Sequence, residues 1–244
     1  MPQMPGGVVG PIGAPNNLEL KAELIGVLDW IESNALAAAG PFEGKADMAR
    51  LGLAGHSLGG KIAMLTSTED ERPIAIFGID PVDAAGGPGA RPSERFPSVT
   101  PELMPLIDVP LGLMGETTNA TCRGPFCQAC APEADNFQQY FNHATSPAIE
   151  IEVLGASHMS FLDDTNCGIA CAVCGEGTDE PAETRQLAHR YMTAFFNVFL
   201  RGDASYRYWL DGQGIQQDIT RGAITSQLDN GLENAPGPPP MERP

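Results

Sequence analysis

Apolar runs of strand length alternate along the chain with segments that carry apolar residues at helical spacing. Residues 51–54, 73–80 and 108–116 are strand-like runs, and residues 149–154 alternate between apolar and polar side chains before the chain breaks at Gly155. Helix-like segments lie between these runs. This order predicts an α/β fold, in which a mostly parallel sheet is covered by helices on both faces.

Two longer helices are predicted on either side of this alternating stretch. The first covers residues 18–36, with Asn17 as its N-cap and with Leu24, Leu28 and Ile31 on one apolar face. The second covers residues 181–202 and ends at Gly202, which is a typical helix stop. Its apolar face consists of Leu187, Tyr191, Ala194, Phe195 and Val198.

The two ends of the chain lack such periodicity. Residues 1–17 are rich in Gly and Pro and predict an irregular start. The segment from about Thr220 has no apolar pattern and ends in "NAPGPPPMERP", so residues 220–244 are expected to form a disordered Pro-rich tail. A chain of 244 residues, 42% of them hydrophobic, can bury one substantial core. We therefore expect a single domain over residues 1–219.

The segment "LGLAGHSLGGKIAMLTST", residues 51–68, has the pattern of a nucleophile elbow. Ser57 lies between Gly55 and Gly59, directly after a strand-like run and directly before a helix-like segment. Such a turn is so sharp that glycine is expected on both sides of the serine, whose hydroxyl is exposed at the carboxyl edge of the sheet. The Leu58 N–H, at the start of the helix, is then the expected oxyanion donor. The simpler alternative is a glycine-rich turn with an incidental serine.

A serine nucleophile needs a base, and the chain has four histidines. His56 adjoins the serine inside the elbow, where its side chain should be directed away from the hydroxyl. His143 lies where a predicted helix ends, and His189 is expected to be partly buried on the closing helix. His158 follows the strand-like residues 149–154 in a loop, which can bring a base to the elbow. We therefore predict His158 as the base; the alternative is a surface loop histidine.

Three carboxylates are candidates for the acid that orients this base. Asp80 ranks first because it ends an apolar strand-like run directly before Pro81, and it keeps the chain order Ser…Asp…His. Asp83 follows three residues later and ranks second. Glu116 ranks third, as the carboxylate that follows the next strand-like run. The alternative for Asp80 is a turn-capping role, which aspartate before proline often has.

Four segments together carry a family resemblance: "GHSLGGK", "IDPVD", "CAPEADNFQQYFN" and "GASHMSFLDD". Their order and spacing resemble chlorophyllase-like members of the α/β-hydrolase superfamily. They are also similar to platelet-activating-factor acetylhydrolases and to bacterial polyester and cutin hydrolases. The resemblance covers about residues 8–211 and implies an α/β-hydrolase fold with serine esterase activity. In the acetylhydrolase-like branch the catalytic acid stands at the position that matches Asp80.

The chain departs from this resemblance at two places. In chlorophyllases an arginine commonly follows the serine, whereas Leu58 stands here, so the resemblance points to ester hydrolysis rather than to chlorophyll as the substrate. Superfamily members also carry several strands before the elbow, including a His-Gly loop that completes the oxyanion hole. Here about fifty residues precede the elbow strand, with one predicted helix. We expect an N-terminally short sheet in a fragment of a longer product.

Charge and hydropathy exclude some classes of partner. The 14 Lys and Arg residues stand against 31 Asp and Glu residues, which gives a net charge of −17 and argues against a nucleic-acid partner. No apolar run reaches the roughly 20 residues that a membrane-spanning helix needs. The start also lacks the basic and then apolar segments of a signal peptide.

The six cysteines form two trios in Gly-rich loops: Cys122, Cys127 and Cys130, then Cys167, Cys171 and Cys174. An even, clustered count favours three structural disulfides and therefore an oxidising compartment, so we expect a secreted or periplasmic protein. Two alternatives are a zinc site at the two C-x-x-C pairs and buried free thiols. Asn119, in "NAT", is a formal glycosylation sequon.

Together these features predict a serine carboxylic-ester hydrolase acting on a small-molecule or polymeric ester. Ser57, His158 and Asp80 would form its triad, and the Leu58 N–H would bind the oxyanion. Met159 and Phe161, beside the base, are candidates for the substrate pocket or for the core. The chemistry needs no metal or organic cofactor. Two alternatives are an amide or peptide hydrolase with the same triad and a non-catalytic hydrolase homologue.

Overall fold

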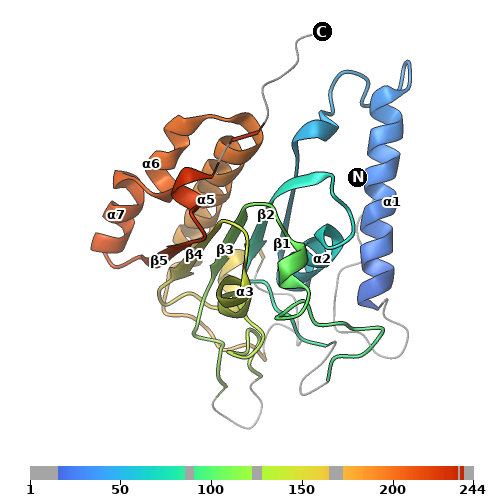
Figure 1. Ribbon diagram of the computed structural model, residues 1–244. Helices are drawn as coiled ribbons and strands as arrows, with labels where there is room; N and C mark the ends of the chain where they lie inside the picture. The colour runs from blue at the N-terminus through green and yellow to red at the C-terminus, as the bar shows by residue number, and fades with distance from the viewer. Residues whose placement is uncertain (1–15, 86–90, 123–127, 165–172, 236, 239–244) are drawn as a thin grey trace.

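The computed structural model describes residues 16–85, 91–122, 128–164, 173–235 and 237–238, and a sheet of five strands runs through its centre (Figure 1). The strands lie in the sheet in their chain order, and β1 to β4 are parallel while β5 runs antiparallel to β4. Their bounds are Leu51–His56 (β1), Pro73–Ile79 (β2), Leu111–Gly115 (β3), Ala148–Val153 (β4) and Ile224–Asp229 (β5). The predicted α/β class and mostly parallel sheet are confirmed.

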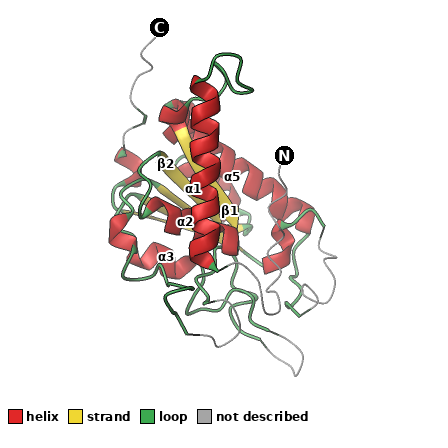
Figure 2. Cartoon of the chain, turned by 90° about the vertical axis from the view of Figure 1, so that its right-hand side faces the viewer, coloured by secondary structure: helices red, strands yellow, loops and turns green. Residues whose placement is uncertain are grey.

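Helices cover both faces of the sheet. On one face α5 packs against β1, β2 and β3, while α2 on the other face packs against β1 and β2. Seen from the side, α1 lies in front of α2 and forms an outer layer (Figure 2). The helices are α1 (Asn17–Leu36), α2 (Leu58–Ser67), α3 (Phe137–His143), α5 (Pro181–Arg201), α6 (Arg207–Leu210) and α7 (Gln213–Thr220). Short 3₁₀ turns are η1 (Met48–Arg50), η2 (Met104–Leu106), η3 (His158–Phe161), η4 (Ala204–Tyr206) and η5 (Leu232–Asn234).

The hydrophobic core has one cluster on each face of the sheet. Side chains of α5 fill the first cluster together with those of β2 and β4, and all five residues of the predicted apolar face of this helix are buried. Residues of α1, α2 and α3 fill the second cluster. Burial of this apolar area, at about 25 cal/mol per Å², is the main force that fixes the strand ends in place.

The C-terminal end of α5 agrees with the sequence prediction, and the N-terminal end of α1 differs from it by one residue. Gly202 caps α5 in the left-handed conformation, with φ 68°, as predicted. The N-cap of α1 is Asn16 rather than Asn17, so that prediction was wrong by one residue. The Asn16 side chain accepts from the Glu19 N–H, and the Glu19 carboxylate accepts from the Asn16 N–H, which is a complete capping box. Glu19 three residues after Asn16 is the signal that distinguishes the two asparagines.

The structure differs from the predicted disordered tail between residues 220 and 235. There the chain forms β5, paired along its length with β4, and then η5. Of β5, Ile224 is buried while most other side chains are half-buried or exposed. The strand is therefore stabilised by backbone hydrogen bonds to the edge of β4 rather than by an apolar pattern, which is why its sequence gave no signal.

None of the described helices combines the length and the apolar character that crossing a membrane would require.

Candidate active site

Ser57 stands at the sharp turn between β1 and α2, as the elbow pattern predicts. Its φ is 54°, which few non-glycine residues adopt. A Cβ on Gly55 would come within 2.2 Å of the Gly59 carbonyl carbon, and one on Gly60 would come within 2.8 Å of Pro81. Among the described residues no heavy atom lies within 4 Å of a Cβ on Gly59. The steric need for glycine therefore falls on Gly55 and Gly60 rather than on both residues of the expected pair.

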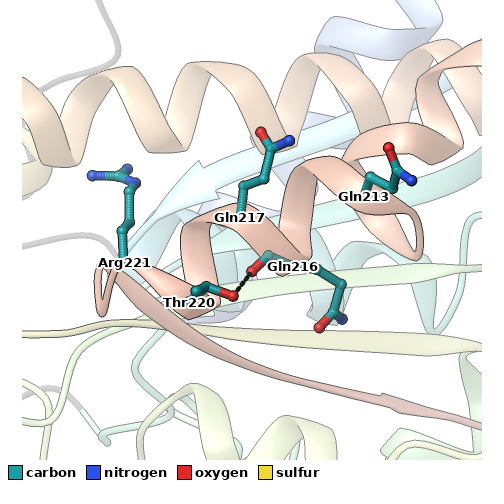
Figure 3. A pocket seen from close by; sticks show the side chains of 5 residues that line it. All are labelled: Gln213, Gln216, Gln217, Thr220 and Arg221. Carbon is teal, nitrogen blue, oxygen red and sulfur yellow. Dashed lines mark hydrogen bonds between the residues drawn. The ribbon is translucent and has the colours of Figure 1, made fainter.

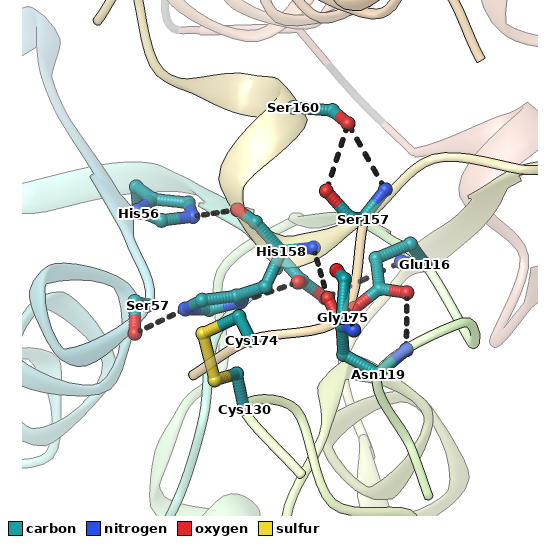
Figure 4. A network of polar contacts seen from close by, with 11 residues as sticks. His56, Ser57, Glu116, Asn119, Cys130, Ser157, His158, Ser160, Cys174 and Gly175 are labelled. Carbon is teal, nitrogen blue, oxygen red and sulfur yellow. Dashed lines mark hydrogen bonds and ion pairs between the residues drawn. A yellow bond between two sulfur atoms is a disulfide. The ribbon is translucent and has the colours of Figure 1, made fainter. Parts of the chain in front are cut away.

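The predicted nucleophile, base and acid lie within hydrogen-bond distance of one another. The Ser57 Oγ is 2.9 Å from His158 Nε2, and the opposite ring nitrogen, Nδ1, is 2.6 Å from the Asp80 Oδ2 (Figure 4). The Asp80 carboxylate is fully buried and His158 is 6% exposed, whereas Ser57 is half-buried. The polar relay therefore runs from the protein interior to a hydroxyl that solvent can reach.

Asp80 reaches His158 because the chain bends where β2 ends. The residue has φ 44°, its N–H donates to the Met114 carbonyl at 2.5 Å, and Pro81 stops the strand. Its second carboxylate oxygen, Oδ1, accepts from the Glu116 N–H at 3.3 Å. The carboxyl ends of neighbouring parallel strands thus bring the acid to the same sheet edge as the elbow.

The other two candidate acids take different positions. Asp83 lies away from His158 and forms a buried ion pair with Lys61, at 3.1 Å between Oδ1 and Nζ. Glu116 is fully buried beside the relay, where it accepts from the Asn119 N–H rather than from an imidazole nitrogen. Of the three carboxylates, Asp80 is the one bonded to the base.

Leu58, the expected oxyanion donor, is the first residue of α2. The N–H groups of the first helical turn have no acceptor within the helix, so this donor can face a ligand. The positive end of the helix dipole lies at the same point and favours negative charge next to the Ser57 hydroxyl.

The remaining histidines have other contacts. His56 Nε2 lies 3.0 Å from the His158 carbonyl oxygen, and the two rings lie 4.6 Å apart between their centres. Burial, with the neighbouring His158, lowers the pKa of His56 to about 3, so this ring is neutral and acts as a donor to the His158 backbone. His143 bonds the Gln139 carbonyl at the end of α3. His189 is exposed on α5, so its predicted partial burial was wrong.

Asn119 is a residue of the site that sequence analysis missed. Its side-chain oxygen accepts from the His158 N–H at 2.7 Å, its Nδ2 donates to the Gly175 carbonyl at 2.9 Å, and its own N–H donates to Glu116 (Figure 4). The residue is 2% exposed. Asn119 therefore fixes the loop that carries His158, and together with His56 it bonds both the N–H and the carbonyl oxygen of His158.

The same contacts exclude the formal glycosylation sequon at Asn119. Its Nδ2 is the atom that a glycan would occupy, and that atom is turned inward and bonded to Gly175. The available signal in the sequence was its position shortly after a strand-like run, three residues beyond Glu116.

A disulfide joins Cys130 and Cys174 next to the base (Figure 4). Gln128 donates its N–H to the Val173 carbonyl beside this bond. Cys122 is also disulfide-bonded. Cys127, Cys167 and Cys171 lie outside the described residues. Because Cys130 and Cys174 are bonded to each other, they cannot act as thiolate ligands of the alternative zinc site.

Replacing both Cys130 and Cys174 with serine should lower the free energy of unfolding by about 2–4 kcal/mol. The bond closes a segment with a sequence separation of 44 residues, so its loss gives the unfolded chain much more freedom. Urea denaturation without reductant measures the change. A denaturation midpoint equal to that of the wild type would contradict the stabilising role.

Met159 and Phe161, the candidate pocket residues, are both half-buried in η3. Phe161 packs against the core cluster that α5 fills, and its ring lies 6.2 Å from that of His56. It therefore anchors η3, the turn that contains His158, to the hydrophobic core. Contact of Met159 with a substrate stays a prediction.

Two further groups of polar residues, one buried and one on the surface, are candidate binding sites. Asp80, Glu116 and His158 each offer a ligand atom within 4.8 Å of the others. His158 Nδ1 and Asp80 Oδ2 already bond each other and Glu116 Oε2 accepts from the Asn119 N–H, while Glu116 Oε1 has no hydrogen-bond partner among the described residues. A shallow hollow on α7 is lined by Gln213, Gln216, Gln217, Thr220 and Arg221 (Figure 3). It adjoins β5, at the opposite edge of the sheet from Ser57, and its Arg221 is paired with Glu183 and Asp218.

Comparison with known proteins agrees with this geometry. The sequence profile of the chlorophyllase family, which is part of the α/β-hydrolase superfamily, matches residues 5–219. The matched segment contains the elbow, the strand end with Asp80 and the loop with His158. No curated protein matches the chain.

Proposed function

Since the chain belongs to the chlorophyllase family, we propose that it is a serine hydrolase that cleaves carboxylic esters. The observation that carries the proposal is the relay from the half-buried Ser57 hydroxyl through His158 to the buried Asp80 carboxylate. A nucleophile, a base within hydrogen-bond reach and a third group that orients the base are the parts that nucleophilic acyl transfer requires.

In the first half of the reaction Ser57 Oγ attacks the ester carbonyl carbon, and its proton moves to His158 Nε2. Asp80 accepts from Nδ1–H, which keeps the other nitrogen free to take the proton and stabilises the imidazolium that forms. The carbonyl oxygen, now negative, accepts from the Leu58 N–H at the start of α2. The tetrahedral species then collapses, and the alcohol leaves with the proton from His158 Nε2.

In the second half a water molecule attacks the acyl-serine and gives its proton to His158. Collapse of this second tetrahedral species breaks the bond to Ser57 Oγ, which takes the proton back from the imidazolium. The products are one alcohol and one carboxylic acid per ester, and all site residues return to their starting states. A small-molecule or a polymeric ester satisfies this chemistry equally.

The test combines labelling with turnover on the full chain. A fluorophosphonate probe should form a covalent adduct that peptide mass spectrometry locates at Ser57, and a short-chain p-nitrophenyl ester should be hydrolysed. Ser57→Ala supplies the background for both readouts and should form no adduct.

Matched substrates separate the remaining alternatives. A p-nitroanilide with the same acyl group should react much more slowly than the ester; equal or faster turnover of the anilide would assign an amide hydrolase instead. A folded wild type that forms no adduct and hydrolyses neither substrate would overturn the proposal in favour of a non-catalytic homologue.

The same proposal includes export to an oxidising compartment. The Cys130–Cys174 bond beside the base supports it, because disulfides persist in secreted and periplasmic proteins and are rare in the cytosol.

A further inference from the structure

Glu116 is a buried carboxyl group next to the relay that the proposed mechanism does not use. It directly follows β3 and is 0% exposed. One of its oxygens, Oε2, accepts from the Asn119 N–H at 2.8 Å. The other, Oε1, is buried and has no hydrogen-bond partner among the described residues. A carboxyl oxygen in such a place needs an explanation, since a buried unpaired acceptor destabilises the fold.

The neighbours of Glu116 disfavour its negative charge. Burial raises the pKa of this carboxyl group to about 8, and the nearby Asp80 carboxylate acts in the same direction. Glu152 of β4 adds a smaller effect of the same sign, while the backbone N–H groups of Asn119 and Thr118 oppose it. The repulsion between two carboxylates in one buried cluster therefore favours the neutral form of Glu116.

We propose that Glu116 is a positioning residue of this site, whose protonated carboxyl group lies against Asp80 at neutral pH and whose ionisation in alkaline solution adds a second negative charge beside His158. The proposal rests on the geometry of this cluster. Side-chain atoms of Asp80, Glu116 and His158 lie within 4.8 Å of one another, and all three residues are buried. As a catalytic statement it rests on the proposed function.

The two protonation states of Glu116 have different effects on the base. In the neutral state Asp80 and Glu116 together carry one negative charge, as in a simple triad, and a protonated Oε1 is a hydroxyl donor rather than a charged acceptor without a partner. In the ionised state a second negative charge faces the imidazole at short range, which favours the imidazolium that forms when Ser57 is deprotonated. Ionisation of Glu116 should therefore strengthen His158 as a base.

The direct test follows the His158 ring by NMR between pH 5 and 10 in protein labelled with ¹³C-histidine. The His158 signal is assigned by its loss in His158→Gln. The variants compared with the wild type are Glu116→Gln, which keeps the shape but cannot ionise, and Glu150→Gln. Glu150 is the matched control because it is also a buried carboxyl, with a pKa raised to about 7 by burial and Glu152, and its side chain contacts Gln227 of β5.

The wild-type signal should show, besides any titration of the ring itself, an inflection at about pH 8. Glu116→Gln should lose that inflection, and Glu150→Gln should keep it. A wild-type signal without an inflection in that range overturns the proposal, and so does an inflection that survives in Glu116→Gln. A wild-type signal that lacks the inflection overturns the proposal even if a variant fails to fold.

The pH profile of kcat/KM for a p-nitrophenyl ester gives the catalytic consequence. In the wild type the profile should rise a second time near pH 8, by about threefold or more, and Glu116→Gln should be flat there. The reaction in Ser57→Ala is subtracted as background. Absence of any Ser57-dependent turnover would reject the proposed function while leaving the NMR result to decide the role of Glu116. Turnover with superimposable profiles would reject the role of Glu116 alone.

Discussion

Asp80→Asn should lower kcat/KM for a p-nitrophenyl ester at neutral pH by about 10⁴-fold, the magnitude typical when the acid of a Ser-His-Asp triad becomes an amide. The carboxylate now accepts from His158 Nδ1–H at 2.6 Å. An asparagine Nδ2 at that position would donate to Nδ1 and force the proton onto Nε2. The ring would then present an N–H to Ser57 instead of the lone pair that takes the serine proton.

Glu116→Gln is the matched control for this prediction, because it removes another fully buried carboxyl group from the same cluster. Its kcat/KM at neutral pH should fall far less than that of Asp80→Asn, since Glu116 is already neutral there. The wild type and both variants should have similar thermal unfolding temperatures. If Asp80→Asn kept its activity and Glu116→Gln lost it, the acid would be Glu116 and the ranking of the three carboxylates would be wrong.

The parts of the fold that the sequence predicted are those with a strong local signal. The apolar face of α5 repeats over the whole helix, from Leu187 to Val198, so one face had to be buried. The strands of the parallel sheet are short apolar runs that end near Gly or Pro, so their positions along the chain could be predicted. Ser57, Asp80 and His158 could be named because each follows the end of such a run, and the ends of parallel strands meet at one edge.

The parts that the sequence did not predict depend on contacts between distant segments. Asn119 has no helix or strand pattern of its own. Its role comes from the nearby Glu116 and from His158 and Gly175, which lie 39 and 56 residues further along the chain. The strand β5 is stabilised by pairing with β4, so its own side chains carry little information. Contacts of this kind are seen in the folded structure and cannot be predicted from a short stretch of sequence.

The buried Lys61–Asp83 pair is a third contact between distant segments that the sequence did not predict. Lys61 follows Ser57 on α2, and Asp83 follows Asp80 after β2. Lys61 Nζ contacts the Asp83 Oδ1 and the carbonyl oxygens of Asp83 and Ala84, each at 3.1 Å. The Asp83 carboxylate also accepts from the segment after residue 97, through Ser98 Oγ, Val99 N, Thr100 N and Thr100 Oγ1.

Asp83→Asn should lower the free energy of unfolding by about 3–5 kcal/mol, the magnitude for breaking one partner of a buried ion pair. Lys61 is 0% exposed, and desolvation already lowers its pKa. Without Asp83 its charge would lie buried among backbone carbonyl oxygens, with the Asp135 carboxylate as a weaker Coulombic partner. The asparagine Nδ2 would also face the backbone N–H groups that now donate to the carboxylate.

Urea denaturation of Asp83→Asn and of Asp163→Asn measures this difference with the same chemical change. Asp163 pairs with Arg185 on the surface, where its side chain is 98% exposed, so its loss should change stability by less than about 1 kcal/mol. An equally small change for Asp83→Asn would mean that Lys61 is neutral in the folded protein. A large loss would show that the ion pair stabilises the contact between α2 and the end of β2, where Ser57 and Asp80 lie. Ester hydrolysis should then be lost at a lower temperature in Asp83→Asn than in Asp163→Asn.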